Sequence, residues 1–238
     1  MDSPVLTCSS LTKAYGPTVA LAGVDLTVGR GEAVAVMGPS GSGKTTLLHC
    51  LSGILRADHG EVVARTDRVH VRVTDLTDAE LARLRREEFG FVFQQGLLLP
   101  ELTVVENVAL PLLLAGVDRR TAESHAAGWL AHLGLVGTEG RRLGQLSGGQ
   151  VQRVAIARSQ ATGPAITFAD EPTGALDQAT SADVLGALLH ATVARGRTLV
   201  MVTHDEAVAA RCSRVVRLRD GRVVHDSAWL PSTHGGAA

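Results

Sequence analysis

The chain has 238 residues, of which 45% are hydrophobic and 20% charged, so it has enough apolar residues for a buried core and is not a disordered protein. Its formal net charge of −1 gives no electrostatic reason to expect nucleic acid as a partner. Three cysteines without a C-x-x-C pair suggest neither a disulfide framework nor a zinc site. The N-terminus shows no signal-peptide pattern and no apolar run approaches about 18 residues, so we expect a cytosolic chain without a transmembrane segment.

The N-terminal part of the chain predicts several strands that lead into a glycine-rich loop. Short alternating or β-branched runs between residues 5 and 36 are separated by turn residues, and the last strand expected is Ala33–Met37. Beyond Thr46, apolar residues recur at helical spacing as far as Leu55, which predicts a helix that begins inside the loop. A strand, a glycine loop and a helix in this order are the context that a P-loop requires.

The loop itself, Gly-Pro-Ser-Gly-Ser-Gly-Lys-Thr-Thr, predicts a site for ATP with Mg²⁺. In a P-loop the glycines leave backbone N–H groups free to surround phosphate oxygens, a lysine reaches the terminal phosphates, and a hydroxyl binds the metal. The minimal pattern arises by chance in roughly one chain in a hundred of this length, and the flanking strand and helix make chance a weaker explanation still. The expected nucleotide ligands are Gly38, Pro39, Ser40, Gly41, Ser42, Gly43, Lys44, Thr45 and Thr46, with Thr45 also on the metal.

The middle of the chain changes in texture after one more predicted strand. Residues 62–73 alternate as strands do, residues 78–88 are charged and helical, and Phe89–Phe93 is an apolar strand. From about 95 to 157 the chain is rich in Leu and Ala, so we predict an inserted helical subdomain there. The helix breakers expected within it are Pro100, Pro111, Gly116 and Gly128.

After the insertion, strands and helices alternate again. The elements expected are a strand over 165–169, a helix over 181–194 and a strand over 198–203. A hairpin then crosses Asp220-Gly221, a dipeptide that suits a two-residue type I′ turn. We predict one α/β domain over residues 1–228, followed by a flexible tail over 229–238.

Two adjacent acids, Asp170 and Glu171, stand at the end of the strand that Pro172 terminates. A P-loop enzyme needs an acid here, so we expect Asp170 to hold Mg²⁺ through water. Glu171 points to the other side of the backbone and is expected to polarise the water that attacks the γ-phosphate. Two acids at a strand end are more often a solvated turn, but the P-loop favours the catalytic interpretation.

A second glycine-containing segment, Leu146–Gln150, precedes a helix expected over 151–160. Ser147 and Gln150 have the spacing of a capping box, which accounts for those two residues without any ligand. The capping box does not account for Gly148 and Gly149, since glycines in a first turn weaken a helix but leave N–H groups open to a phosphate. A second anion-binding helix N-terminus has a use if two copies of the chain meet head to tail.

These motifs, in this order, resemble the ATP-binding domains of ABC transporters over about residues 5–226. The resemblance implies an α/β fold, a P-loop NTPase (RecA-like) core with an antiparallel β subdomain and an inserted α-helical signature subdomain. It also implies that Gln94 is a catalytic and metal-binding Q-loop residue, and that His204 is the catalytic switch histidine. Asp177 matches the D-loop at the nucleotide, and Tyr15 matches the aromatic residue that stacks on adenine.

Each of these later matches has a plainer alternative. Tyr15 precedes Gly-Pro and would by itself more often be a turn residue packed on the surface. Either Gln94 or its neighbour Gln95 would pass as a solvated loop amide, although the family register favours Gln94. His204 at a strand end would usually be structural, but the resemblance favours a contact with the γ-phosphate.

The resemblance implies a homodimer that closes around two ATP molecules. Each ATP lies between the P-loop of one subunit and Ser147–Gln150 of the other, and hydrolysis loosens the dimer. Two departures from the family pattern are Gly174, where serine is often found, and Thr167, which interrupts an otherwise apolar strand. Neither departure removes a charged or catalytic group, so ATPase activity is still expected.

The segment from Phe89 to Val117, with residues 74–81 and 171–174, resembles the lipoprotein-release and macrolide-export ATPases that drive FtsX-like transmembrane permeases. This implies an export-type subunit that lies peripherally on the inner face of the cell membrane. One alternative is a regulatory ATPase of the cell-division type, which signals through its permease without transport. A soluble ABC protein of translation or DNA repair is disfavoured, because those usually carry two ATPase domains or a long coiled-coil insertion.

Overall fold

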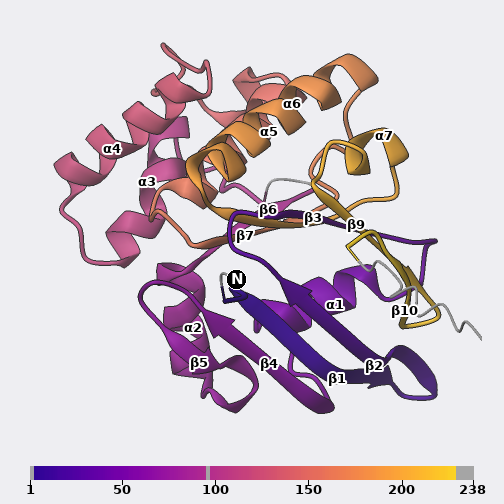
Figure 1. The fold of residues 1–238 in the computed structure, drawn as a ribbon. Coiled ribbons are helices and arrows are strands. Elements are labelled where there is room, and N and C mark those ends of the chain that lie inside the picture. The colour runs from indigo at the N-terminus through magenta and orange to yellow at the C-terminus, as the bar shows by residue number, and fades with distance from the viewer. Residues whose placement is uncertain (1–2, 95–96, 229–238) are drawn as a thin grey trace, which may run out of the picture.

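The structure of the chain is a computed structural model that describes residues 3–94 and 97–228. Two β-sheets and a layer of helices make up the fold (Figure 1). Gln95 and the tail expected over 229–238 lie outside the described residues. Among the described helices, none combines the length and the apolar character needed to cross a bilayer.

The central sheet has six strands in the order β10-β9-β3-β8-β7-β6. Every neighbouring pair is parallel except the β9–β10 hairpin. Its strands are β3 (Ala33–Met37), β6 (Phe89–Phe93), β7 (Ile166–Asp170), β8 (Thr198–Val202), β9 (Arg214–Arg219) and β10 (Arg222–Asp226). Because β3, β8 and β7 are adjacent and parallel, the loops that follow these three strands leave the sheet at the same edge.

A second, antiparallel sheet has the strand order β2-β1-β4-β5. Its strands are β1 (Leu6–Tyr15), β2 (Thr18–Val28), β4 (His59–Arg65) and β5 (His70–Arg72). Helix α1 (Lys44–Leu51) lies between the two sheets (Figure 1). Leu47, Leu48 and Leu51 on this helix are buried in one apolar cluster with residues of both sheets, so α1 joins the sheets through a shared core.

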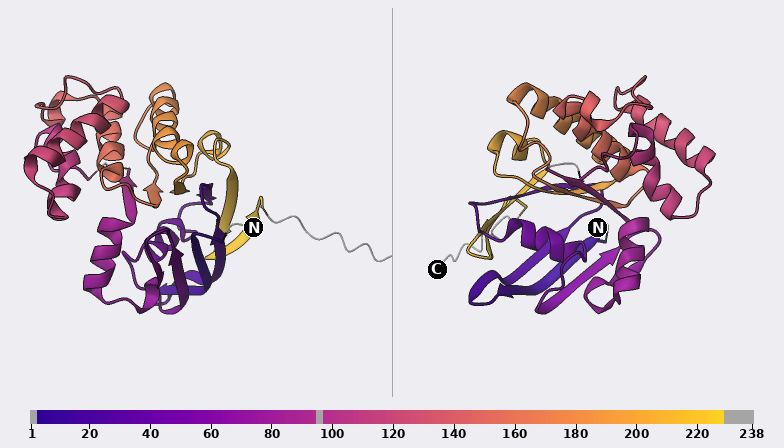
Figure 2. Two further views of the ribbon diagram at one scale, coloured as in Figure 1. Left: turned by 60° about the vertical axis from the view of Figure 1, so that its left-hand side comes forward. Right: turned by 180° about the vertical axis from the view of Figure 1, so that it is seen from behind.

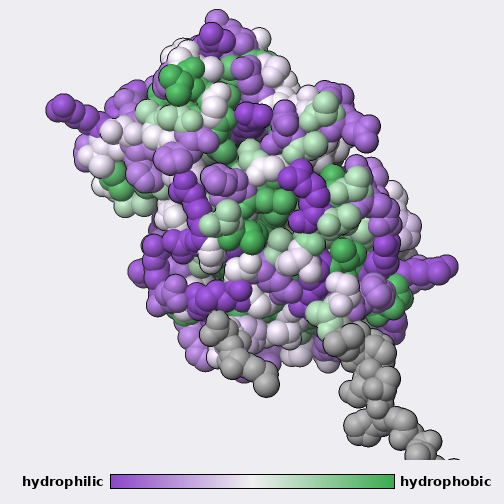
Figure 3. Space-filling view, turned by 45° about the horizontal axis from the view of Figure 1, so that its top comes forward, coloured by the Kyte–Doolittle hydropathy of each residue, from purple (hydrophilic) through white to green (hydrophobic). Residues whose placement is uncertain are grey.

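The opposite face of the central sheet is covered by helices (Figures 1 and 2). The helices on that side are α3 (Val104–Leu114), α4 (Arg119–His132), α5 (Gly148–Gln160), α6 (Gln178–Ala191) and α7 (Glu206–Ala209), with 3₁₀ turns η2 (Leu143–Gln145) and η3 (Val193–Arg195). Helix α2 (Asp78–Glu87) and the 3₁₀ turn η1 (Val73–Asp75) instead pack into the core around α1. Strand β8 packs on both sides of the sheet. Its Val200 and Val202 lie in the apolar cluster around α1, whereas Leu199 and Met201 lie in the cluster formed with the covering helices. Figure 3 shows hydrophobic residues gathered near the middle of one face, with hydrophilic residues toward its edges.

Local geometry confirms the expected hairpin and shortens one expected helix. Asp220 and Gly221 have φ values of 49° and 70°, as a type I′ turn requires. Helix α1 ends at Leu51 because Gly53 has a φ of 64° and forms a Schellman motif, in which the N–H of Ile54 donates to the carbonyl of His49 at 2.9 Å. The apolar residues after Leu51 therefore lie beyond the helix.

Two of the expected helix breakers are wrong, because Pro111 lies inside α3 and Gly128 inside α4. Buried residues anchor both helices, among them Val108 of α3 and Leu130 of α4, so tertiary packing outweighs the local preference of these two residues. Helix α6 also begins three residues earlier than expected, at Gln178, because Asp177 caps it. The boundaries of the inserted helical subdomain stay a prediction.

Candidate functional site

The candidate site lies where the loops after β3, β7 and β8 meet. Residues 38–46 follow β3, Asp170 and Glu171 stand at the end of β7, and His204 lies two residues beyond β8. The parallel register pairs Val36 of β3 with Val202 and pairs Asp170 with that same Val202. This topology brings together groups that are more than 120 residues apart in the chain.

The P-loop backbone has its required glycines for two different reasons. A Cβ at Gly38 would lie 2.1 Å from the carbonyl oxygen of Leu218, and one at Gly43 would lie 2.2 Å from that of Ala20. At Gly41, which has a φ of 81°, a Cβ would meet nothing within 4 Å. Gly38 and Gly43 are therefore fixed by packing against neighbouring backbone, whereas Gly41 is fixed by its dihedral angle alone.

The lysine of the loop is held by the loop itself. Lys44 Nζ donates to the carbonyl oxygens of Gly38 and Pro39, both at 2.9 Å, and the residue is only 8% exposed. No side chain caps the N-terminus of α1, so its first N–H groups lack a side-chain acceptor. In the described part of the chain, the buried hydroxyl of Ser42 also has no hydrogen-bond partner. An ammonium, open N–H groups and a free hydroxyl together fit a phosphate.

A pair of oxygen ligands faces the start of α1. Thr45 Oγ1 donates to Asp170 Oδ1 at 3.2 Å. Burial raises the pKa of the Asp170 carboxyl, and the hydrogen bond from Thr45 partly opposes that rise. Among the residues that the structure describes, no cluster of three or more His, Cys, Asp or Glu side chains forms a metal site. One hydroxyl and one carboxylate fit Mg²⁺, because this ion usually keeps waters and phosphate oxygens as its other ligands.

Two of the three predicted catalytic residues, Glu171 and His204, contact each other directly. Glu171 Oε2 lies 2.6 Å from His204 Nδ1. Glu171 has a φ of 47°, which is unusual for a residue other than glycine, and its N–H donates to the carbonyl of Val202 at 3.0 Å. From this left-handed turn the carboxylate of Glu171 reaches His204. Such strain is common where a functional group must be held in place.

Gln94 approaches the same carboxylate across Gly174. A Cβ built on Gly174 would lie 3.1 Å from Gln94 Nε2 and 3.3 Å from Glu171 Oε2, so both groups border one small space. The glycine in place of serine keeps that space open. Beside it, a cavity of about 500 Å³ is lined by Glu171, His204 and Leu176, a feature that no pattern in the sequence indicated.

Local contacts within the chain account for three of the residues in the segment Ser147–Gln150, including one of its two glycines. The capping box is present, with Ser147 N donating to Gln150 Oε1 at 3.0 Å. A Cβ on Gly149 would lie 2.5 Å from Thr180 Cγ2, so contact with α6 also requires a glycine there. Within the described chain, no hydrogen bond or ion pair joins 147–150 to the P-loop residues 38–46.

The remaining expected nucleotide ligands, Asp177 and Tyr15, form no hydrogen bond or ion pair with Lys44 among the described residues. Asp177 caps α6, with Oδ1 accepting from the N–H of Thr180 at 3.0 Å. Tyr15 ends β1 and is 53% exposed, with Lys13 Nζ 5.9 Å from the centroid of its ring. The roles of Asp177 and Tyr15 toward a nucleotide stay predictions.

Residues 21–174, more than half of the chain, match the family model described as ABC transporter. The chain belongs to the ABC transporter family. As a cassette of this family it is an ATPase, and both the expected fold class and the expected enzyme class are confirmed.

The similar ABC proteins of known sequence include export and release systems. The chain is 46% identical over 228 residues to the lipoprotein-releasing system ATP-binding protein LolD of Geobacter metallireducens, covering 94% of this chain and 100% of that protein. It is 44% identical over 231 residues to the macrolide export ATP-binding/permease protein MacB of Hyphomonas neptunium, covering 95% of this chain. The chain spans only 35% of the length of that second relative.

A solved ABC cassette shares the fold at high similarity. The dimeric post-hydrolysis structure of the ATP-binding cassette MJ0796, bound to ADP and Pi, superposes with a TM-score of 0.83 at 39% identity. The match covers 93% of this chain and 97% of that one. The two-sheet cassette with a helical layer is therefore shared with a protein seen as a nucleotide-bound dimer.

Proposed function

We propose that this ABC ATPase energises an export-type or lipoprotein-releasing permease of the FtsX-like kind, from the inner face of the cell membrane. The observation that carries the proposal is the match to LolD at 46% identity over 100% of that protein, which is named for lipoprotein release. Relatives named for macrolide and pyoverdine export support the same class, at 44% and 43% identity.

A groove on the surface offers a place for the membrane partner. It lies between α2 and α3, has a volume of about 460 Å³, and exposes Ile54 and Leu114 by 43% and 68%. The guanidinium groups of Arg85 and Arg86 also line it. An apolar floor with a basic rim suits a short amphipathic segment that carries an acidic side chain, as a cytoplasmic loop of a permease would.

In the proposed hydrolytic cycle each site residue has one task. Lys44 exchanges the carbonyls of its own loop for the terminal phosphates, and Glu171 polarises the attacking water. His204, which already touches Glu171, contacts the γ-phosphate while Gln94 senses the same end of the nucleotide. Thr45 and Asp170 would hold Mg²⁺, which would neutralise phosphate charge.

We further propose that two copies of the chain sandwich the nucleotides. The N-terminus of α5 presents the Ser147–Gln150 segment without any partner in the P-loop of its own chain, which leaves this segment available to a second copy. The dimeric form of the MJ0796 cassette supports this arrangement. ATP would then hold the dimer closed, and loss of the γ-phosphate would let it open.

The substitution Glu171→Gln tests the base and the dimer together. We expect the variant to bind ATP and to elute as a dimer with ATP in size-exclusion chromatography. Its ATP turnover should fall by about a hundredfold or more, which is the loss expected when a general base is removed. The matched control is Glu101→Gln, which changes an exposed glutamate of a turn and should leave both properties unchanged. A Glu171→Gln protein that stays monomeric and hydrolyses ATP at the wild-type rate would refute both assignments.

The permease assignment needs a membrane experiment. We expect the chain, expressed with its neighbouring genes, to co-purify with a permease from detergent-solubilised membranes. Recovery only in the soluble fraction would contradict a transporter role. If the reconstituted pair hydrolyses ATP but moves no substrate, the regulatory cell-division type becomes the better assignment.

A further inference from the structure

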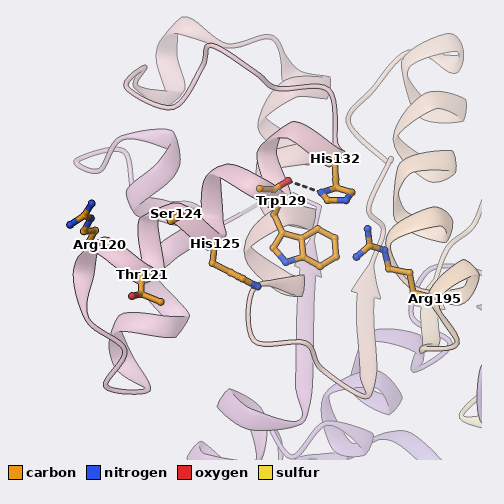
Figure 4. Close-up of a pocket in the computed structure, with 8 residues that line it drawn as sticks. Arg120, Thr121, Ser124, His125, Trp129, His132 and Arg195 are labelled. Carbon is orange, nitrogen blue, oxygen red and sulfur yellow. Dashed lines mark hydrogen bonds between the residues drawn. The ribbon is translucent and has the colours of Figure 1, made fainter.

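A second groove lies on the helical layer and is lined by residues that have no role in the sites described above. Seven residues of α4 and Arg195 of η3 line a hollow of about 650 Å³, which we call the α4 groove (Figure 4). It shares no lining residue with the cavity beside Glu171 or with the groove between α2 and α3. Neither ATP hydrolysis nor permease docking therefore accounts for it.

The α4 groove is basic although the whole chain carries a net charge of −1. Arg120, Arg195 and two histidines line it, and no carboxylate does. Among the residues described by the structure, neither Arg120 nor Arg195 forms an ion pair. Glu123 of the same helix is not available to them, since its carboxylate binds Arg119 at 2.6 Å.

At one end of the α4 groove a guanidinium group lies over an indole ring. The guanidinium carbon of Arg195 lies 4.5 Å from the centroid of the Trp129 ring, and Figure 4 shows the two groups facing each other across α4 and η3. Among the described residues the guanidinium of Arg195 forms no hydrogen bond or ion pair, so its N–H groups are open to a carboxylate. His132 Nδ1 donates to the carbonyl of Gly128 at 2.7 Å, which orients the imidazole ring at this end of the groove.

The shape of the α4 groove favours a peptide over a compact anion. Its lining residues recur every three to four positions from Arg120 to His132, a stripe about 18 Å long at 1.5 Å per residue. That length matches roughly five residues of extended chain. Gly128 leaves the middle of the stripe without a side chain, and a Cβ there would meet nothing within 4 Å.

We propose that the α4 groove docks an acidic segment of a partner protein. Its carboxylates would bind the open edges of Arg195 and Arg120 at the two ends, while its backbone passes over Gly128. Charge complementarity and length carry this assignment, and it stands independently of the permease proposed above.

Binding of fluorescein-labelled deca-glutamate to the full chain, measured by fluorescence anisotropy, tests the proposal. Saturating ADP and Mg²⁺ block the P-loop, so any remaining binding reports on another site. We expect Arg195→Ala and Arg120→Ala each to weaken binding about tenfold, the size expected for loss of one charge-assisted hydrogen-bond pair. Arg222→Ala, which removes an exposed arginine of β10, is the matched control and should bind as the wild type does.

One further variant and one further measurement guard against misfolding as an explanation. Gly128→Phe should fill the α4 groove and abolish binding, and Arg195→Ala should leave basal ATP turnover unchanged. Deca-glutamine should not bind. The proposal is overturned if Arg195→Ala and Arg222→Ala bind deca-glutamate equally well. It is also overturned if inorganic phosphate displaces the peptide at equal concentration, since that would mark a site for small anions.

Discussion

The two glycines Gly43 and Gly41 provide a quantitative test of how the P-loop is built. Both have a left-handed φ, 98° and 81°, so alanine at either position costs about 1–2 kcal/mol in backbone strain. Only Gly43 adds a collision, because its Cβ would lie 2.2 Å from the carbonyl oxygen of Ala20. Overpacking of this kind costs about 1–3 kcal/mol more. We therefore expect the free energy of unfolding to fall by about 2–5 kcal/mol in Gly43→Ala and by about 1–2 kcal/mol in Gly41→Ala.

Urea unfolding of the nucleotide-free protein, followed by circular dichroism, measures both losses. In a chain of this length each kcal/mol lowers the melting temperature by about 2–4 °C, so thermal melts give an independent check. Because both variants share the backbone cost, their difference isolates the contact with Ala20. Equal losses for Gly43→Ala and Gly41→Ala would show that the backbone next to Gly43 relaxes freely, and the packing argument would fail.

Three smaller predictions concern single substitutions elsewhere in the fold. Gly174→Ser should keep ATP turnover within about twofold of wild type in a coupled assay, because the exposed Gln94 amide needs to move only a few tenths of an ångström; a tenfold loss would contradict this. Thr167→Val should lower the free energy of unfolding by about 1–2 kcal/mol, because a buried glutamine amide loses an acceptor at 2.9 Å; an unchanged urea midpoint would refute it. A hydrogen bond from Arg214 lowers the pKa of Asp226, so the charged pair stabilises the fold at neutral pH and this stabilisation is lost as the pH falls through that pKa. Asp226→Asn should therefore lower the free energy of unfolding by about 1–3 kcal/mol at pH 7 and by progressively less in acid. A loss that does not change with pH would exclude the ion pair as the cause.

Local patterns predicted the elements of this fold well, because each depends on neighbouring residues. Strands β3, β6 and β7 lie within a residue of their expected positions, and the Asp220-Gly221 turn has the expected type. The expectations failed where distant contacts decide. Pro111 stays helical because α3 is held by the helices packed on it, and the order of the six strands depends on pairings that no local pattern encodes.

The candidate site was predictable as a set of residues but not as a geometry. The spacing of the motifs and their resemblance to ABC ATPases predicted that four residues form one nucleotide site: Lys44, Asp170, Glu171 and His204. The left-handed turn at Glu171 and its 2.6 Å contact with His204 have no signature in the sequence, because they depend on where β8 ends beside β7. Thr167 seemed an interruption of an apolar strand, yet its hydroxyl accepts from a buried amide and so satisfies a core polar group.

If Lys44 has the role proposed above, its present hydrogen bonds imply that the P-loop needs little rearrangement to bind a nucleotide. With both neighbouring carbonyls accepting from its ammonium at 2.9 Å, the loop is already wrapped around a positive charge. An arriving phosphate would replace these neutral acceptors with charged ones, and the new charge-assisted hydrogen bonds from Lys44 would be stronger. The unpartnered Ser42 hydroxyl and the uncapped N-terminus of α1 would gain acceptors at the same moment. The free energy of nucleotide binding would then not be consumed in folding the loop, and it would remain available for closing the proposed dimer.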